Sequence, residues 1–302
     1  MAVPLPAVSL AAVPGRRRAT LELAREIERR GFSGIYCPSF GDGVGLCEAL
    51  ALATERIHFG TSIANIYLRH VVDYAQTASL IHELSGGRFA FGVGVSHGPA
   101  LERLSVKAGP PLGDMRAFVA NLRAAPRVGE LPPIVLATLR KKMIALAGEV
   151  ADGIVFANVA RSHMAESLAA LPPGKANDPR FYIGDMIPTC ISDDEAAAAA
   201  VNRKTLIGYV SLPNYRNYWR EAGYVEEMDA IEKAVAARNF DEVPRLMTER
   251  WLSDVTLYGS VRRVREGLEA WYDAGVRTPI LVPSSAAGNQ LKAFEELFAC
   301  FG

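Results

Sequence analysis

An apolar segment that is punctuated by glycines and ends in a histidine, residues 85–97, constrains the fold more than any other part of the chain. It reads SGGRFAFGVGVSH and follows a helical pattern over residues 71–84. The glycine pair at its start suits the end of that helix, because glycine adopts the left-handed conformation without steric cost. Residues 89–95 show no polar alternation, which is typical of a strand buried on both faces of a parallel sheet. We interpret the segment as one unit of an α/β enzyme, with His97 at the carboxyl end of a strand, where such folds place their chemistry.

Two glycines, Gly92 and Gly94, interrupt this expected strand. Glycine weakens a strand unless another group must approach its backbone closely. We interpret the pair as room for a flat ligand that lies against the strand.

The same alternation of short apolar strands and helices runs along most of the chain. Strands are expected at residues 8–10, 34–37, 57–63, 89–95, 134–137, 154–157, 182–190 and 278–282. Helices are expected at residues 18–30, 46–54, 71–84, 112–123, 142–150 and 261–274, the last with Ser260 and Gly275 as its caps. This pattern predicts an α/β fold, a TIM-like (β/α)8 barrel, with a helical insertion over residues 193–250 between strands 7 and 8. Residues 1–302 are expected to form a single domain, because no linker or low-complexity segment interrupts the pattern.

The composition gives no support for a nucleic-acid or membrane partner. Lys plus Arg and Asp plus Glu both number 33, so the net charge is zero, whereas those partners require a basic surplus. The short, proline-broken apolar stretch at the N-terminus fits neither a signal peptide nor a membrane span. The four cysteines are scattered without a Cys-x-x-Cys or Cys/His cluster, so we expect reduced thiols, no metal site and a cytoplasmic location.

Motifs that identify several large enzyme classes are absent from the sequence. The glycines at positions 92, 94 and 98 miss the dinucleotide-binding spacing Gly-x-Gly-x-x-Gly by one residue. No Walker sequence, Gly-x-Ser-x-Gly elbow or His-Glu-x-x-His occurs. These absences argue against most nucleotide-dependent dehydrogenases, phosphotransferases, serine hydrolases and zinc proteases.

A helix that opens near Leu139 carries a cluster of positive charge in its first turn. Arg140, Lys141 and Lys142 lie there and Glu149 lies in the last turn, which opposes the helix dipole at roughly 0.3–1 kcal/mol per charge. A bound anion would make the arrangement favourable, because the backbone amides, the dipole and the cations would all attract it. Two interpretations stay open, a phosphate-binding site and a solvated basic face.

Residues 60–67, GTSIANIY, run from the third expected strand into its loop. Their small side chains leave room for a planar ring and Asn65 offers both a donor and an acceptor, but a packed layer of small side chains explains the pattern equally well.

Asp42, which stands between glycines after the second strand, is interpreted as a turn former rather than a ligand. His97 is the strongest candidate for proton transfer, because the free pKa of histidine lies near neutrality.

The expected insertion carries an aromatic cluster. For this cluster, packing of the extra helices is favoured over contact with a substrate. Its members are Tyr209, Tyr215, Tyr218, Trp219 and Tyr224.

Three longer stretches, residues 53–70, 83–97 and 145–158, resemble the luciferase-like flavin-dependent monooxygenases and oxidoreductases. The resemblance is closest to the branch that uses the deazaflavin coenzyme F420, which includes methylenetetrahydromethanopterin reductase. Residues 190–195 and 274–283 extend it to nearly the whole chain. The combination is specific for the family and says little about the substrate.

The resemblance implies a TIM-like barrel that binds F420, or FMN as the alternative, at the carboxyl ends of its strands. In such proteins the bond after the serine of Gly-Thr-Ser is often a non-proline cis peptide, which here is the Ser62–Ile63 bond. The family places flavin contacts on the positions that match Ser39, Ser62, Ile63, Asn65, Val95 and Ser96. It places phosphate-side contacts on the positions that match Leu139, Arg140, Lys142 and Met143.

The sequence departs from the family pattern at positions that bear on chemistry. Arg140 and Lys141 replace a usual Gly-Pro, so the phosphate contacts are expected to differ. Ser39 and Phe40 stand where the sugar-phosphate dehydrogenases of the family carry an Asp-His pair, and His97 stands where they carry a catalytic glutamate. Oxidation of a sugar phosphate is therefore not expected.

The resemblance implies an oxidoreductase that transfers hydride between F420 and a small organic substrate. His97, because of its place at the end of a strand, is our candidate for the catalytic group that donates or accepts a proton. Residues 98–131 are shorter than in the family, which predicts a more open pocket. One alternative keeps the fold but uses reduced FMN and oxygen as a monooxygenase. Another is a barrel that binds a flavin or pterin without turnover, which the loss of the strand-two histidine favours. The family often forms homodimers, so a second copy is the expected protein partner.

Overall fold

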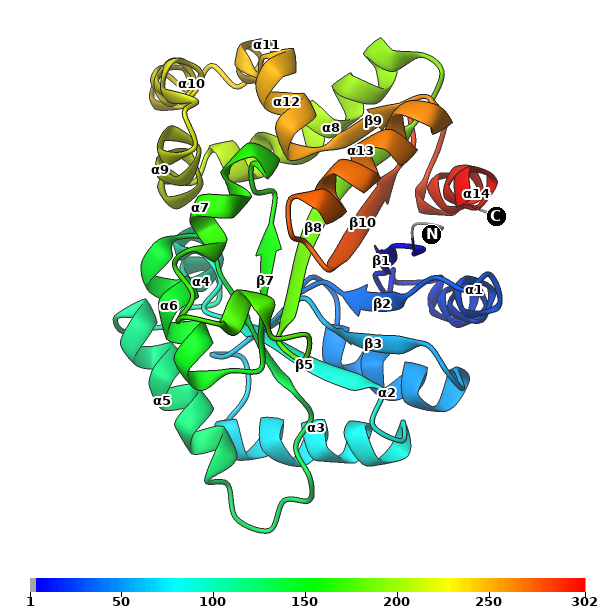
Figure 1. The fold of residues 1–302 in the computed structure, drawn as a ribbon, viewed down its shortest axis with the longest axis vertical. Helices are drawn as coiled ribbons and strands as arrows, with labels where there is room; N and C mark the ends of the chain where they lie inside the picture. The colour runs from blue at the N-terminus through cyan, green and yellow to red at the C-terminus, as the bar shows by residue number, and fades with distance from the viewer. Residues whose placement is uncertain (1–3, 302) are drawn as a thin grey trace. The chain divides into compact units, whose positions relative to one another are not determined.

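The computed structural model describes residues 4–301, and the chain divides into two compact units. The N-terminal unit contains residues 4–156 and 168–184. The C-terminal unit contains residues 157–167 and 185–301. Strands and helices alternate along most of the chain, and in the C-terminal unit α8 to α12 follow one another without a strand between them (Figure 1).

The N-terminal unit is built on a parallel sheet. Its strands pair in the order β1, β2, β3, β5, β6, β7, and β4 pairs with β5. The strands are β1 (Ala7–Ser9), β2 (Gly34–Cys37), β3 (His58–Thr61), β4 (Ala64–Asn65), β5 (Phe89–Gly94), β6 (Ile134–Ala137) and β7 (Gly153–Ala157). The helices are α1 (Arg17–Arg29), α2 (Gly43–Ala53), α3 (Val71–Leu84), α4 (Gly98–Arg103), α5 (Pro111–Arg123) and α6 (Lys141–Val150).

Aromatic side chains cover one face of β5. The ring of Phe91 lies 5.5 Å from that of Tyr74 on α3, and Tyr74 meets Phe118 on α5 edge-on at 5.9 Å. Each such pair contributes roughly 0.5–1.5 kcal/mol beyond the area it buries. These contacts explain how α3 and α5 pack on this strand.

The C-terminal unit combines strand pairs with a long helical segment. β8 pairs with β9 in parallel and also with β10. The strands are β8 (Tyr182–Ile191), β9 (Leu257–Gly259) and β10 (Thr278–Ser284). The helices are α7 (Met164–Leu168), α8 (Glu195–Val210), α9 (Pro213–Glu221), α10 (Val225–Ala236), α11 (Val243–Leu246), α12 (Glu249–Val255), α13 (Val261–Asp273) and α14 (Gln290–Phe301).

Helices α8 to α12 pack around the aromatic cluster of this unit. The ring of Tyr215 lies 5.1 Å from Tyr209 and 5.4 Å from Trp219, and Trp219 lies 4.9 Å from Trp251. Trp219 and Trp251 are fully buried. The interpretation of the cluster as packing is therefore confirmed.

The succession of strands and helices is that of a (β/α)8 barrel, which confirms the predicted fold class. The eight predicted strands correspond to β1, β2, β3, β5, β6, β7, β8 and β10, each within two residues of its predicted ends. The short elements α4 and β9 escaped prediction, because six and three residues carry too little periodicity.

Helix α2 begins three residues earlier than predicted, because Asp42 caps it. The Asp42 carboxylate accepts a hydrogen bond from the Gly45 amide at 2.9 Å. Asp42 thus shapes the local backbone, in agreement with its interpretation as a turn former. The four cysteines are buried free thiols. Every helix within residues 4–301 is too short or too polar to cross a membrane.

Candidate functional site

We call residues 61–67, which run from the last residue of β3 through β4, the β3 loop. Its first residues are tied to both strands that neighbour β3. Thr61 Oγ1 donates to the Gly92 carbonyl of β5 at 2.6 Å, and the Ser62 amide donates to the Cys37 carbonyl of β2 at 2.7 Å. The β3 loop therefore starts from a fixed position between β2 and β5.

The Ser62–Ile63 peptide bond of this loop is cis, as the resemblance implies. Two glycines of β5 make room for it. A Cβ on Gly92 would collide with the carbonyl oxygen at the end of β3, and a Cβ on Gly94 would lie 3.0 Å from Ile63 Cδ1 and 2.9 Å from the Cβ of Ala137 on β6. A close approach to this strand is thus confirmed, but the expectation of a flat ligand is wrong at Gly92. The backbone of the protein's own β3 loop already fills that space.

Hydrogen bonds fix the second half of the β3 loop. Asn65 is 4% exposed, and its Oδ1 accepts from the Tyr67 amide at 3.0 Å while its carbonyl accepts from the Tyr74 hydroxyl at 2.7 Å. The Tyr67 hydroxyl donates to Asp114 Oδ2 at 2.6 Å, and the Gly109 amide donates to the same oxygen at 2.7 Å. The Asn65 side-chain oxygen therefore already accepts one hydrogen bond within the loop. Its two amide hydrogens, which no hydrogen bond among residues 4–301 engages, are the donors that it offers a ligand.

The residues after β5 include the candidate catalytic group. Val95, Ser96 and His97 are half-buried, and Ser96 has a φ of 61°, which is uncommon for a residue other than glycine. His97 is the N-cap residue of α4, and its carbonyl accepts from the amides of Ala100 and Leu101 at 3.0 Å each. Burial lowers the pKa of His97, so its imidazole is neutral at pH 7. A neutral imidazole can donate a proton from one ring nitrogen and accept a proton at the other.

Helix α6 begins at Lys141 and has Arg140 as its N-cap residue. An arginine side chain has no acceptor, so it cannot cap the first amides as Asp42 and Ser260 do at the starts of α2 and α13. Lys141 and Lys142 are exposed in the first turn. Helix amides together with cations form the donor set that a phosphate group prefers.

A buried hydroxyl lies just before this helix. Thr138 follows β6 and is 6% exposed, and its Oγ1 has no hydrogen-bond partner among residues 4–301. Buried hydroxyls are normally hydrogen-bonded, so this group is a further candidate contact for an oxygen of a ligand. Sequence reasoning missed Thr138, although its place directly after a buried strand was a usable signal.

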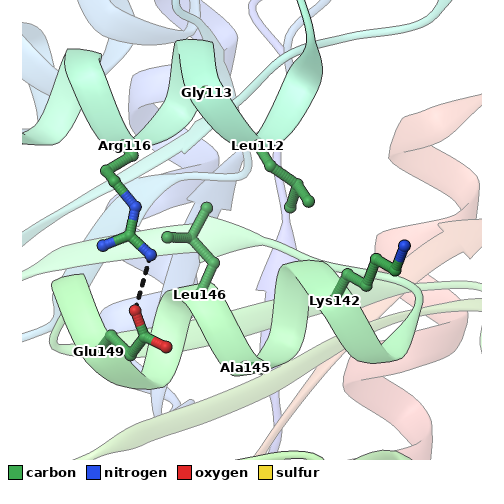
Figure 2. Close-up of a pocket in the computed structure, with 7 residues that line it drawn as sticks. All are labelled: Leu112, Gly113, Arg116, Lys142, Ala145, Leu146 and Glu149. Atoms are coloured by element: carbon green, nitrogen blue, oxygen red, sulfur yellow. Dashed lines mark hydrogen bonds and ion pairs between the residues drawn. The ribbon is translucent and has the colours of Figure 1, made fainter.

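Lys142 also lines a groove of about 320 Å³ between α5 and α6 (Figure 2). Its side chain lies at the end of the groove away from the ion pair of Arg116 with Glu149, which are 2.7 Å apart. Lys142 and Glu149 share one face of α6. Lys142 therefore extends the positive charge of the helix start onto the α5 side of α6.

The predicted site residues come from the carboxyl ends of neighbouring parallel strands. Because β2, β3, β5 and β6 pair in parallel, these ends share one edge of the sheet. The residues are Ser39 after β2, Ser62 and Ile63 after β3, Asn65 on β4, Val95, Ser96 and His97 after β5, and Leu139, Arg140, Lys142 and Met143 after β6. Within this set Ser39 is exposed, whereas Met143 is half-buried inside α6. The packing of Ile63 on Gly94 beside Ala137 joins three of these strand ends directly.

One family profile, described as luciferase-like monooxygenase, matches residues 6–127 and 113–278. A curated relative is a putative coenzyme F420-dependent oxidoreductase of Mycobacterium tuberculosis. It is 24% identical over 282 residues, which cover 78% of this chain and 81% of that protein.

Solved structures share the fold at low sequence identity. The coenzyme F420-dependent tetrahydromethanopterin reductase of Methanopyrus kandleri aligns with a TM-score of 0.77 at 17% identity and covers 97% of both chains. The oxygenating constituent of 3,6-diketocamphane monooxygenase of Pseudomonas putida, solved with FMN, aligns with a TM-score of 0.62 at 16% identity and covers 98% of this chain and 96% of that chain. Because the family profile matches most of its sequence, this chain belongs to the luciferase-like monooxygenase family.

Proposed function

We propose that this protein binds coenzyme F420 and transfers hydride between it and a small organic substrate. The observation that carries the proposal is made at Gly94 of β5, where a Cβ would lie 3.0 Å from Ile63 Cδ1 and 2.9 Å from the Cβ of Ala137. The β3 loop therefore borders the strand that leads into the cation-bearing start of α6. The residues proposed for the ring and those proposed for the phosphate thus follow strands of one parallel sheet, in which β5 pairs with both β3 and β6. Relatives named for F420 support this choice of cofactor.

The residues present fit a ring cofactor that carries a phosphate group. Thr138 offers a buried hydroxyl without a partner among residues 4–301, and α6 offers cations and helix amides. The residues that would hold the ring are Ser39, Ser62, Ile63, Asn65, Val95 and Ser96. The residues that would hold the phosphate are Leu139, Arg140, Lys142 and Met143. When bound, the deazaflavin supplies the hydride chemistry.

His97 is proposed as the group that moves a proton. Its burial favours the neutral imidazole, which is the form that can accept a proton at neutral pH. The left-handed Ser96 precedes it and α4 follows it, so its backbone is constrained on both sides. A proton can therefore be held at His97 Nδ1 or Nε2 while the substrate changes its oxidation state.

The cofactor assignment is tested by titrating the apo-protein separately with F420, FMN and NADPH. We expect F420 to bind most tightly. Tight binding of FMN with weak binding of F420 would replace the hydride-transfer proposal by an FMN-dependent monooxygenase, a class that occurs among the structural neighbours. Tight binding of NADPH alone would contradict both.

The phosphate site is tested with the double variant Arg140→Ala/Lys142→Ala. Hydrogen bonds to charged groups are worth roughly 1.5–3 kcal/mol each, so the loss of two should raise the dissociation constant of F420 by about a hundredfold or more. The matched control is Arg16→Ala/Arg18→Ala, because α1 also begins with an arginine N-cap and basic residues in its first turn. Unchanged affinity in the α6 variant would identify its cations as a solvated basic face.

A further inference from the structure

A groove of about 580 Å³ lies within the C-terminal unit, between α8 and the chain around the start of α11. Its volume is within the range of roughly 300–1,000 Å³ that is typical of small-molecule pockets. One wall is a single face of α8 that carries Ala200, Arg203, Lys204 and Ile207, which are spaced three and four residues apart. The opposite wall consists of side chains from residues 240–245. The groove is separate from the candidate cofactor residues, none of which lines it.

The backbone of the opposite wall is fixed by a turn after α10. Arg238 has a φ of 56°, and the amide of the next residue, Asn239, donates to the Ala234 carbonyl at 2.9 Å. Asn239 Nδ2 donates to Glu242 Oε2 at 2.7 Å. Glu242 is thus bonded within the turn, and of the residues that line the groove only Asp241 is acidic.

Three cationic side chains line the groove without a carboxylate partner. Arg203, Lys204 and Arg245 form no ion pair within residues 4–301. Arg203 is half-buried, and its Nε donates to the Met247 carbonyl at 3.1 Å. Because its guanidinium makes that one hydrogen bond within the described chain, both Nη nitrogens keep their donors for a ligand.

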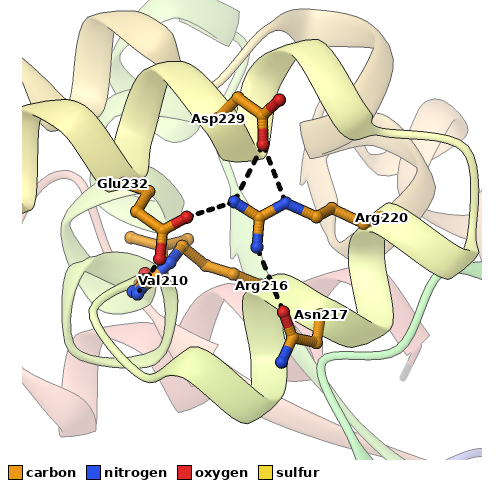
Figure 3. A network of polar contacts seen from close by, with 6 residues as sticks. All are labelled: Val210, Arg216, Asn217, Arg220, Asp229 and Glu232. Atoms are coloured by element: carbon orange, nitrogen blue, oxygen red, sulfur yellow. Dashed lines mark hydrogen bonds and ion pairs between the residues drawn. The ribbon is translucent and has the colours of Figure 1, made fainter.

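The cations of the adjacent helix α9 are paired instead (Figure 3). Arg216 donates to Glu232 of α10 at 3.0 Å, and Arg220 donates to Glu232 at 2.5 Å and to Asp229 at 2.8 Å. Figure 3 shows both guanidinium groups directed to the carboxylates of α10. The groove differs because its three cations share one carboxylate, which leaves an excess of positive charge where a ligand would lie.

Apolar side chains lie in the same groove. Phe240 is 46% exposed although an aromatic ring gains free energy when it leaves water, and Ile207 is half-buried on the α8 wall. A ligand with an apolar body would cover these two side chains, and an anionic group on that body would pair with the cations. The lining therefore fits a molecule that is both apolar and negatively charged.

We propose that this groove binds a small organic carboxylate with an apolar body. An arginine guanidinium pairs with a carboxylate through two parallel hydrogen bonds, which Arg203 can supply from its Nη nitrogens. A phosphate fits the α8 wall less well, because residues 200–207 lie inside the helix, where the backbone amides are bonded and cannot join the cations. The site belongs to the C-terminal unit alone, so it is independent of the proposed function.

The test is titration of the full chain with 2-naphthoate, followed through the methyl signals of Ile207 by NMR, which report on the groove itself. The control ligand is 2-naphthamide, which has the same rings without the negative charge. We expect naphthoate to shift the Ile207 signals and to bind about tenfold more tightly than naphthamide, because each partly exposed charge pair contributes up to about fivefold. Sodium chloride at about 0.5 M should remove most of that difference, because it screens exposed charges.

The double variant Lys204→Ala/Arg245→Ala should weaken naphthoate binding by about tenfold and leave naphthamide binding unchanged. Both side chains are exposed, so the variant should fold as wild type does. The matched control is Lys233→Ala/Arg262→Ala, which removes two exposed cations of α10 and α13 outside the groove and should bind naphthoate as wild type does. Phe240→Ala should weaken the binding of both ligands by the same factor.

Several results would overturn the proposal. These are unshifted Ile207 signals at saturating naphthoate, equal affinity for naphthoate and naphthamide, and unchanged naphthoate affinity in Lys204→Ala/Arg245→Ala. A tighter response of Ile207 to inorganic phosphate than to naphthoate would identify a phosphate site instead. Dimerisation of the wild type that Lys204→Ala/Arg245→Ala abolishes, measured by sedimentation, would identify the groove as a contact between two copies of the chain.

Discussion

The β3 loop and residues 158–163 after β7, which we call the β7 loop, both follow strands, but their conformations are determined by different parts of the chain. The partners that fix Asn65 in the β3 loop lie two and nine residues away, and the Thr61 hydroxyl bonds a carbonyl 31 residues away on the next paired strand. The partners of the β7 loop lie 58, 61 and 92 residues away. The conformation of the β3 loop thus depends largely on its own residues and on adjacent glycines. The conformation of the β7 loop depends on the helices of the insertion.

The largest expected effect tests whether the end of β5, the strand against which the β3 loop packs, carries the reactive group. His97→Gln should leave the fold and cofactor binding nearly intact and lower the single-turnover rate of cofactor oxidation by about 10²–10⁴-fold, because general acid–base groups contribute that much. The melting temperature is measured on the same sample. A large loss of melting temperature with a wild-type rate would show that His97 is a structural residue.

The next prediction concerns Gly92 of β5, whose missing side chain leaves room for the backbone of the β3 loop. Gly92→Ala places a Cβ against the backbone carbonyl at the end of β3, which cannot move as a flexible side chain would. We expect a loss of about 3 kcal/mol or more in the free energy of unfolding, measured by urea denaturation. The control is Gly113→Ala, because a Cβ there meets nothing within 4 Å and α5 should gain about 0.5–1 kcal/mol. Equal stability of the two variants would contradict the close approach.

A smaller effect removes the hydrogen bond of the β3 loop to Asp114, which lies 47 residues from Tyr67. Burial and the hydrogen bond to Asp114 raise the pKa of Tyr67, so its hydroxyl stays protonated and donates at all ordinary pH values. Tyr67→Phe should cost about 1–2 kcal/mol and increase hydrogen exchange within residues 61–67. If exchange in that segment is unchanged, the loop is fixed by its local bonds alone, which would sharpen the contrast with the β7 loop.

The smallest effect concerns a buried carboxyl beside the β7 loop. Asp185 on β8 is fully buried near the amides of Val159 and Met186, and burial raises its pKa well above 3.8. The folded state therefore holds this proton more tightly than the unfolded state does, so stability is greatest below pH 3.8 for this group and is lost as pH rises toward the raised pKa.

Asp185→Asn removes that titration. The variant should melt about 2–4 °C above wild type at pH 8, with little gain at pH 4, if ionisation of the carboxyl costs about 1 kcal/mol. The measurement is the melting temperature of both proteins across this pH range. A constant difference between them at every pH would contradict the titration of Asp185.

The sequence predicts the parts of the molecule that depend on local pattern. Buried strands, helix caps such as Ser260 and the close approach at Gly94 follow from periodicity and from the properties of glycine. The cis bond at Ser62–Ile63 follows from the family resemblance. These features need no knowledge of distant side chains.

Other features of the site depend on residues that only folding brings together. The bond of Tyr67 to Asp114 spans 47 residues, and the bond of Ser162 to Asp254 spans 92. Neither pair has a motif that would identify the partner. The hydrogen bond that the Asn65 side-chain oxygen accepts from the Tyr67 amide depends on the geometry of the turn. The sequence alone therefore does not show that this oxygen is already bonded within the loop.

The most direct test of the central claim is hydrogen exchange of the protein with and without saturating coenzyme F420. The account predicts slower exchange in residues 61–67, 95–98 and 139–143, with the β7 loop equally protected in both states. Binding that slows exchange only in the C-terminal unit, or no binding of F420 at all, would contradict the placement of the cofactor on the β3 loop and the start of α6.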